Sequence, residues 1–340
     1  MVFELADEIA KYKAEQQELL SICIENLLAG YYEGNLILLI SRPLCAFIRD
    51  KQLVKSDRGL VALYHIENST AYLPNVLWRI KVVLENADSS KHELEYTFFA
   101  ETKSVLPTSF LCENIDDVKF YMRLVEIYYP TTPIIANFYH GGGGTTQDVF
   151  NYLKSKRVVC LVIIDSDIKY PGCDIGETAR KCVGRYKKKL SYVEMEVLNV
   201  HEAENLVPLA FMKKHTCDHK GADFLDKMSQ RGLDGLMRYY DVKKGIRKDS
   251  AVAKEGYLNF CKDLYERLYP RKKTSFEKYL SQMKKDDDRL FPIINSDMLR
   301  DFYTDRKNTY NHDDVLEVER VKIASLVHTF VCCRGFDPIN

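Results

Sequence analysis

Two aspartates spaced two residues apart, Asp165 and Asp167, directly follow an unbroken apolar run. The run reads VVCLVII, and most of its residues are β-branched, which is typical of a strand buried on both faces of a parallel sheet. Ligands of open α/β sheets bind outside the carboxyl ends of the strands. Two carboxylates this close repel each other unless a cation lies between them or one is protonated. The pair therefore predicts a site for a hard cation such as Mg²⁺, which prefers oxygen ligands.

Other acidic residues follow two further predicted strands. Glu113 ends the segment SFLCE and precedes Asp116 and Asp117, while Glu202 and Glu204 follow the strand-like VEMEVLNV. Acids are favourable at helix N-termini, so capping explains Asp116 better than metal binding does, and a first-turn role explains one of the two glutamates. The ordered set of acids at three strand ends nevertheless indicates one site, provided that the strands are neighbours.

The segment that carries these acids alternates strands with helices. Between residues 105 and 212 the predicted strands are SFLCE, PIIANFY, VVCLVIID and VEMEVLNV, and the predicted helices span residues 115–129, 147–155, 176–189 and 202–214. Four strands separated by helices predict a parallel sheet with right-handed crossovers. The fold class is therefore α/β, with a Rossmann-like sheet in a central domain at residues 105–214.

The flanking regions have different patterns. Residues 1–30 show helical spacing ended by Gly30, and NLILLIS, GLVALYHI, LWRIKVVLE and HELEYTFFAE then resemble strands. These features predict a small α+β N-terminal domain at residues 1–104, serving as a scaffold or docking module. Beyond the central domain the periodicity is helical, which predicts an α-helical C-terminal domain at residues 215–340.

Composition bounds the possible functions. Lys+Arg and Asp+Glu are equal at 49 each, so overall charge gives no support for a nucleic-acid partner, and any basic surface must be local. The N-terminus lacks a signal-peptide pattern, and no stretch reaches the roughly 18 apolar residues of a membrane span. The ten cysteines have no regular spacing, which favours reduced thiols and a cytoplasmic location.

Local positive charge is concentrated at residues 180–189, RKCVGRYKKK. Because phosphates dominate nucleic-acid affinity, this segment predicts a phosphate-facing surface formed by Arg180, Lys181, Arg185, Lys187, Lys188 and Lys189. Two tail segments, at 243–248 and 271–273, are also basic, and solvated helix faces explain them equally well. None of these segments distinguishes DNA from RNA.

Two other sequence patterns resemble a phosphate-binding loop and a zinc site, but their residue spacing favours neither function. The loop GGGGTT at residues 141–146 lacks the lysine of a phosphate-binding P-loop, so we interpret it as a flexible loop that lets substrate approach the sheet edge. The segment HTCDH, which contains His215, Cys217 and His219, lacks a paired CxxC partner, so zinc binding there is not favoured.

Taken together, three segments resemble Toprim domains. FLCENIDDVKFYMRLVE is similar to the opening of a Toprim domain, IIDSD to its DxD motif, and HEAENLVP to the Glu-Asn element of Toprim nucleases of the OLD type. The resemblance covers residues 105–212. Asn114 stands where glycine is usual, and no Walker A segment is present. The chain therefore resembles the stand-alone Toprim effectors encoded beside a separate ATPase, such as that of the PARIS anti-phage defence system.

This resemblance implies a metal-dependent endonuclease of DNA or of tRNA or another RNA. One or two Mg²⁺ or Mn²⁺ ions would be bound by Glu113, Asp165 and Asp167, with Glu204 or Glu202 at a second position. Lys169, Lys213 and Lys214 are candidates for a basic group near the scissile phosphate. The implied partners are nucleic acid, an AAA/ABC-type ATPase that restrains a toxic effector, and a second copy of the chain in a homodimer.

A different class of function is a non-catalytic Toprim-like module that docks on a partner protein or nucleic acid. Asn114 and the neutral net charge favour this alternative. Affinity for Mg²⁺ or Mn²⁺ separates the two hypotheses, because only the nuclease requires a metal.

Overall fold

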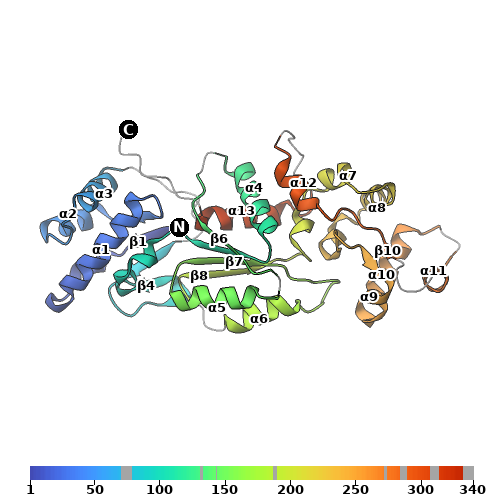
Figure 1. Cartoon of the computed structure of the whole chain (residues 1–340), viewed down its shortest axis with the longest axis horizontal. Helices are drawn as coiled ribbons and strands as arrows, with labels where there is room; N and C mark the ends of the chain where they lie inside the picture. Colours follow the sequence, from blue (N-terminus) through green and yellow to red (C-terminus); the bar gives the residue numbers. More distant parts are fainter. Residues whose placement is uncertain are drawn as a thin grey trace. The chain divides into compact units, whose positions relative to one another are not determined.

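A computed structural model describes residues 1–69, 79–130, 133–142, 144–186, 190–271, 274–283, 289–306 and 314–331 of the chain (Figure 1). It contains two parallel four-stranded sheets and one small antiparallel pair of strands. The chain forms two compact units. The first comprises Met1–Ile163, Lys181–Glu196 and Ile323–Asn340, and the second comprises Ile164–Arg180 and Val197–Lys322. The two units are described separately below.

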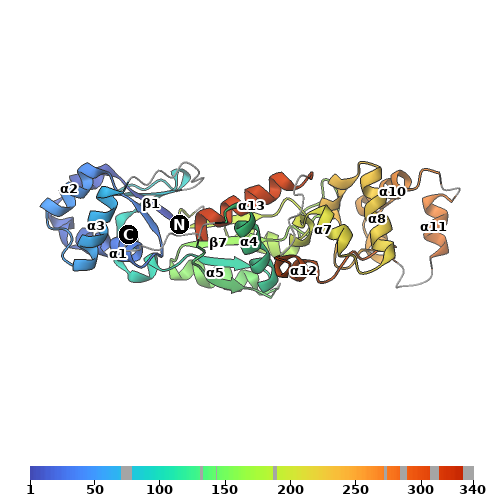
Figure 2. The ribbon, with the colours of Figure 1, turned by 90° about the horizontal axis from the view of Figure 1, so that it is seen from above.

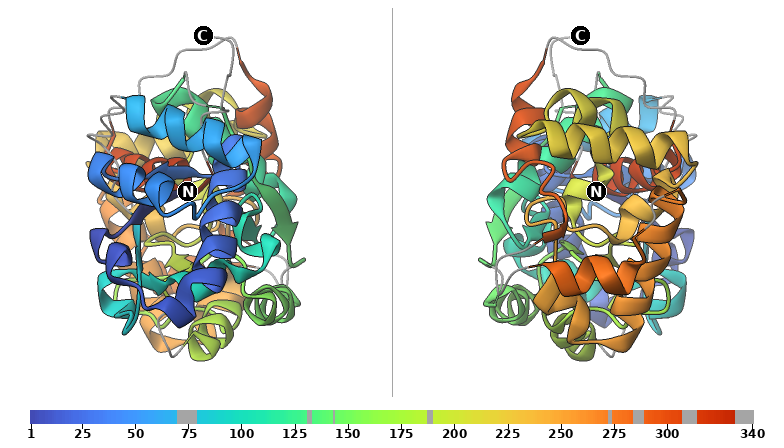
Figure 3. Two further views of the ribbon diagram at one scale, coloured as in Figure 1. Left: turned by 90° about the vertical axis from the view of Figure 1, so that its left-hand side faces the viewer. Right: turned by 90° about the vertical axis from the view of Figure 1, so that its right-hand side faces the viewer.

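The N-terminal sheet belongs to the first unit and is parallel throughout, with strand order β2-β1-β3-β4. Its strands are β1 (Val2–Leu5), β2 (Ile37–Leu39), β3 (Ile80–Val83) and β4 (Glu93–Glu95), and its helices are α1 (Gln17–Tyr32), α2 (Arg42–Asp50) and α3 (Asp57–Asn68). Figure 3 shows these helices, in blue, from the N-terminal side. The prediction of an α+β domain is wrong here, because helical crossovers join parallel strands, as in an α/β unit.

Two local predictions in this region are also wrong. The segment GLVALYHI is part of helix α3, not a strand. Its N-cap Ser56 accepts a hydrogen bond from the Gly59 amide (3.0 Å), and Ala62, Leu63 and Ile66 are buried at helical spacing. The first residues form β1, so α1 begins later than predicted. It also continues past Gly30, where the absence of a side chain permits close packing against neighbouring side chains.

The central sheet has strand order β6-β5-β7-β8 and agrees with the prediction. Its strands are β5 (Ser109–Cys112), β6 (Asn137–His140), β7 (Cys160–Ile164) and β8 (Val193–Val197). The intervening helices are α4 (Ile115–Tyr128), α5 (Thr146–Lys156) and α6 (Glu177–Arg185). Within the first unit, α4 and α5 lie on opposite sides of the sheet (Figure 1). All five residues of β7 are buried, which matches its continuous apolar sequence.

The chain after β8 is mostly helical, as its periodicity predicts (Figure 2). The helices are α7 (Leu209–Lys214), α8 (His219–Gln230), α9 (Lys248–Val252), α10 (Glu255–Leu268), α11 (Phe276–Gln282), α12 (Met298–Thr304) and α13 (Glu317–Val331). An antiparallel pair, β9 (Ile246–Arg247) with β10 (Arg289–Phe291), was not predicted, because such short strands show no periodicity. Among the described residues, no helix combines the length and apolar character that crossing a membrane requires.

Six short 3₁₀ segments and one longer one complete the described elements. They are η1 (Asp7–Lys11), η2 (Ala14–Gln16), η3 (Ser89–Lys91), η4 (Tyr96–Ala100), η5 (Thr102–Val105), η6 (Ala203–Leu206) and η7 (Asp234–Tyr239). The last two lie at the candidate site, because Glu202 caps η6, Glu204 belongs to it, and Asn205 of η6 donates to the carbonyl of Met237 in η7.

Candidate metal centre

The turn that follows β7 places Asp165 and Asp167 against the segment that carries the glutamates. The Ala203 amide donates to Asp165 Oδ1 (3.0 Å), and the Asp167 amide donates to the carbonyl of His201 (2.8 Å). Between the two acids, the buried Ser166 hydroxyl donates to the carbonyl of Val200 (2.5 Å). These bonds connect two acid-bearing segments that the sequence separates by more than thirty residues.

Asp167 has a left-handed backbone (φ 54°), which is uncommon for a residue with a side chain. Gly176 supports this conformation by donating its amide to the carbonyl of Ser166 (2.7 Å). A Cβ added at Gly176 would lie 2.2 Å from Asp167 Oδ2 and 2.5 Å from Asp167 Cβ. Glycine is therefore required at position 176 if the Asp167 carboxylate is to keep its place.

The turn HEAEN is anchored by Asn205, whose side chain is completely buried. Its amide nitrogen donates to the carbonyls of Met237 and Tyr240 (2.7 Å each), and its side-chain oxygen accepts from the Glu202 amide (2.7 Å). A buried amide with its hydrogen bonds satisfied fixes the local backbone. Asn205 thus holds Glu202 and Glu204 in place, which gives a physical role to the asparagine of this motif.

Lys243 connects the two glutamates. Its ammonium lies 2.9 Å from Glu204 Oε1 and 3.2 Å from Glu202 Oε2, and the carboxylates themselves are buried. Burial lowers the pKa of Lys243, but the two carboxylates outweigh it, so the pKa is raised. Burial raises the pKa of Glu202, and the charge of Glu204 raises it further, while Lys243 opposes both. The single ammonium of Lys243 therefore forms ion pairs with two buried carboxylates.

One carboxylate oxygen of Glu204 receives no hydrogen bond from the described part of the chain. Its Oε2 atom is buried and accepts no hydrogen bond from any described residue. Such a buried acceptor is costly unless water or an ion completes it. An acceptor of this kind beside Asp165 and Glu202 fits the oxygen ligands that Mg²⁺ prefers.

His201 and Asp241 adjoin the same glutamates. One ligand atom each from His201, Glu202 and Asp241 lies within 4.8 Å of the other two. Burial lowers the pKa of His201, but the carboxylates of Asp241, Glu202 and Asp167 outweigh it and raise the pKa. Burial raises the pKa of Asp241, but His201 and the Lys244 amide outweigh it and lower the pKa.

Four predicted acids of the second unit, Asp165, Asp167, Glu202 and Glu204, lie on two turns joined by hydrogen bonds, and their role as metal ligands stays a prediction. Glu113 belongs to the first unit and directly follows β5. Its carbonyl accepts from the Gly142 amide (2.9 Å). Its participation in a shared metal site remains a prediction.

The predicted catalytic lysines have other contacts. Lys169 lies over the ring of Tyr257, with its ammonium 5.9 Å from the ring centre. Lys213 pairs with Asp226 (3.3 Å). Lys214 is the last residue of α7. Lys243, which the sequence placed only in a basic tail segment, is the lysine with direct contacts to the predicted acids.

The basic segment at 180–189 is described only in part. Arg180, Lys181 and Arg185 lie on α6, whereas Lys187, Lys188 and Lys189 fall outside the described residues, as do residues 272–273. Arg180 is exposed, and the carbonyl of Arg185 accepts from the Lys154 ammonium (3.0 Å). A phosphate-binding role for this segment stays a prediction.

The two patterns that the sequence did not favour have structural explanations. In the glycine-rich loop, a Cβ at Gly141 would lie 2.2 Å from Thr146, so close packing requires this glycine. In HTCDH, the ring of His215 stacks on Phe211 at 4.0 Å, Cys217 Sγ donates to the carbonyl of Ile293, and His219 begins α8.

The sequence missed His201, Asp241 and Lys243 as members of the site. His201 stands beside the predicted Glu202, so its position was a usable signal. Asp241 and Lys243 lie in a loop far along the chain, and local spacing cannot reveal that this loop returns to the acid turn. The hydrogen bond from the Val242 amide to Glu202 Oε1 (3.1 Å) is what makes the connection.

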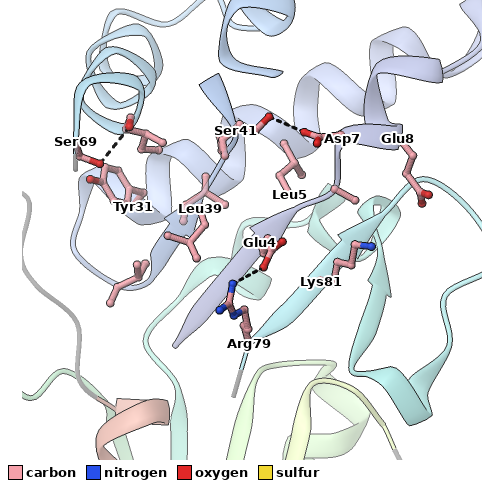
Figure 4. A pocket seen from close by; sticks show the side chains of 15 residues that line it. Glu4, Leu5, Asp7, Glu8, Tyr31, Leu39, Ser41, Ser69, Arg79 and Lys81 are labelled. Carbon is pink, nitrogen blue, oxygen red and sulfur yellow. Dashed lines mark hydrogen bonds and ion pairs between the residues drawn. The ribbon is translucent and has the colours of Figure 1, made fainter. Parts of the chain in front are cut away.

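A pocket of about 570 Å³ lies on the N-terminal sheet, near the carboxyl ends of β1 and β2 (Figure 4). Two of its acidic groups have partners that also line the pocket. Glu4 pairs with Arg79 (2.9 Å), and Asp7 accepts from the Ser41 hydroxyl (2.5 Å). The location is where ligands bind in parallel sheets, but these internal pairs do not define a ligand chemistry.

Comparisons with known proteins identify no relative. No protein-family model, no curated protein and no solved structure matches this chain.

Proposed function

We propose that this protein is a Mg²⁺- or Mn²⁺-dependent nuclease of the Toprim type, with Asp165, Asp167 and Glu204 as metal ligands. The observation that carries the proposal is the joining of the two acid turns. The amide of Ala203 binds the carboxylate of Asp165, and the amide of Asp167 binds the carbonyl of His201. Acids placed on neighbouring turns favour a cation, and Glu204 Oε2 is a buried acceptor suited to one.

A metal held by these oxygens would activate a water molecule and stabilise charge during phosphodiester hydrolysis. The chain itself would supply three further functions. Asp165 and Glu204 orient the ion, Gly176 keeps Asp167 in place, and Lys243 brings a positive charge next to the site. A lysine in this position can balance the negative charge that develops on the phosphate. Its direct contacts make Lys243 a better candidate than Lys169 or Lys213.

The resemblance to stand-alone Toprim effectors also suggests a cellular role, a partner protein and a substrate. On this basis the nuclease is a toxic effector of an anti-phage defence system, is restrained by an AAA/ABC-type ATPase, and cleaves tRNA or DNA in the cytoplasm. Glu113 would then complete the metal site, and α6 would contribute Arg180, Lys181 and Arg185 to nucleic-acid binding. These statements rest on motif resemblance and on charge, so the isolated protein should be tested first.

The decisive experiment incubates purified protein with plasmid, single-stranded DNA and total tRNA in the presence of Mg²⁺ or Mn²⁺. We expect cleavage of at least one substrate, its loss in excess EDTA, and its loss in Asp165→Ala and Glu113→Ala. Asp174→Ala is the matched control, because Asp174 is an exposed carboxylate in the loop that follows Asp167. Circular dichroism and thermal unfolding establish that each variant is folded.

Two results would refute the proposal. Cleavage by the wild type that persists in excess EDTA would exclude a metal-dependent mechanism. Calorimetry that detects no affinity for Mg²⁺ or Mn²⁺ would favour the alternative function, a non-catalytic module that docks on a partner or on nucleic acid.

A further inference from the structure

A second group of potential ligands adjoins the turn HEAEN (residues 201–205, here called the acid turn) and lies in the same compact unit. His201 and Glu202 come from the turn that precedes η6, and Asp241 comes from the loop that follows η7. Their ligand atoms lie within 4.8 Å of one another. His201 is only 3% exposed and Glu202 only 7%. This group differs from the Asp165–Glu204 set because it offers an imidazole nitrogen as well as oxygen.

The imidazole of His201 has unused bonding capacity. Its Nδ1 atom is buried and has no hydrogen-bond partner among the described residues. Its Nε2 atom lies 3.9 Å from Asp241 Oδ2, which is longer than a hydrogen bond. The two ring nitrogens face opposite edges of the imidazole, so Nε2, which faces Asp241, is the one that can bind an ion shared with this carboxylate.

The two carboxylates are oriented by the backbone, each through one oxygen. Glu202 Oε1 accepts from the Val242 amide (3.1 Å), and Asp241 Oδ1 accepts from the Lys244 amide (2.7 Å). The second oxygens, Glu202 Oε2 and Asp241 Oδ2, point to Lys243 and His201 respectively. Supporting hydrogen bonds that fix ligand carboxylates in this way are typical of metal sites.

We infer that His201, Glu202 and Asp241 form a binding site for one Zn²⁺ ion. Imidazole nitrogen favours zinc over Mg²⁺, and three protein ligands plus water are a common four-coordinate zinc arrangement. The local charge agrees, since Glu202 and Glu204 share the ammonium of Lys243 and Asp241 adds a further carboxylate near Glu202. Glu202 would hold the ion through one carboxylate oxygen, and the Lys243 ammonium would remain in contact with Glu204.

The ion would have a structural role, because it would connect the turn of His201 and Glu202 to the loop of Asp241. The carbonyl of His201 accepts the amide of Asp167, and the amide of His201 donates to the carbonyl of Arg238 (2.6 Å). Zinc on the His201 side chain would therefore connect the loop of Asp241 to the turn that positions Asp167. The inference does not depend on the proposed nuclease activity, because metal binding is measurable in a protein that cleaves nothing.

The test begins with protein stripped of metal by EDTA and then freed of chelator. Zn²⁺ is titrated by calorimetry in the presence of excess Mg²⁺, which saturates oxygen-only sites. We expect one zinc equivalent in the wild type and an affinity weaker by on the order of 100-fold or more in His201→Ala. His215→Ala is the matched control, because His215 Nε2 also faces a carboxylate, Asp305 Oδ2, at 4.0 Å.

The control also separates this site from the segment HTCDH, since zinc bound there would be lost in His215→Ala. Should His201→Ala fail to fold, Asp241→Asn replaces it, because the amide oxygen can still accept from Lys244. Zinc should also slow hydrogen exchange at the Asp167 amide. Absence of saturable Zn²⁺ binding in the wild type, or equal affinity in wild type and folded His201→Ala or Asp241→Asn, overturns the inference. Zinc binding retained by an inactive Asp165→Ala would support it.

Discussion

Removal of Lys243 gives the sharpest test of the electrostatics at the acid turn. In Lys243→Ala, the carboxylates of Glu202 and Glu204 lose their shared ammonium, at 3.2 and 2.9 Å, while remaining buried. Loss of one partner from a fully buried ion pair costs about 3–5 kcal/mol. Because the Lys243 side chain is 33% exposed, solvent screens part of the interaction. We therefore expect the metal-free protein to lose about 2–3 kcal/mol of unfolding free energy.

Urea unfolding in EDTA measures this loss, and the same experiment in Mg²⁺ tests its origin. A divalent cation replaces the missing positive charge, so Mg²⁺ should stabilise Lys243→Ala more than it stabilises the wild type. Lys244→Ala is the control, since Lys244 is exposed and uses its backbone amide to bind Asp241. It should stay within about 0.5 kcal/mol of the wild type. Equal stability of Lys243→Ala and Lys244→Ala in EDTA would refute this account.

Two further substitutions test how the turns are held. Gly176→Ala adds a methyl group that would lie 2.2 Å from Asp167 Oδ2. This overpacking should lower the free energy of unfolding by about 1–3 kcal/mol. Displacement of the Asp167 carboxylate should also lower the Mg²⁺ affinity measured by calorimetry at least about tenfold. Gly235→Ala, with no atom within 4 Å, should change neither quantity, and an unchanged Gly176→Ala would contradict the packing argument. Asn205→Ala removes three hydrogen bonds and takes from the buried Glu202 amide and Tyr240 carbonyl the partner that Asn205 supplies, so it should cost about 2–4 kcal/mol in urea unfolding. The exposed Asn199→Ala should cost less than about 0.5 kcal/mol, and similar losses in both variants would rule out an anchoring role for Asn205.

The sequence predicted the central sheet well because its signals are local. A strand such as β7 is apolar throughout, and helices such as α4 carry their own capping residues. Asn114, for example, accepts a hydrogen bond from the Asp116 amide (3.3 Å), while Asp117 accepts from the Asn114 amide (2.8 Å). This pair also gives Asn114 a structural role at the position where Toprim domains usually have glycine. The capping carboxylate is therefore that of Asp117, whereas Asp116, for which capping was the preferred interpretation, pairs with Lys119 (3.5 Å).

Prediction failed where tertiary packing decides the outcome. GLVALYHI has residues common in strands, but burial of Ala62, Leu63 and Ile66 on one side selects a helix. At the candidate site, Asp165 was predictable because it directly follows β7, and Glu202 because it lies a few residues after β8. Lys243 and Asp241 were not, since tertiary hydrogen bonds bring their loop to the acids, among them those of Asn205 to Met237 and Tyr240 and that of the Val242 amide to Glu202.

The cost of grouping these acids is the strongest physical reason to expect cations at the site. Backbone amides hold the carboxylates of Asp165, Glu202 and Asp241, and the Lys243 ammonium holds that of Glu204. These bonds restrict how far the carboxylates can move apart to relieve their repulsion. Lys243 contacts both glutamates, and Glu204 Oε2 accepts no hydrogen bond from the residues that the structure describes. Because Gly176 and Asn205 hold the turns in this arrangement, cation binding should contribute to both stability and function.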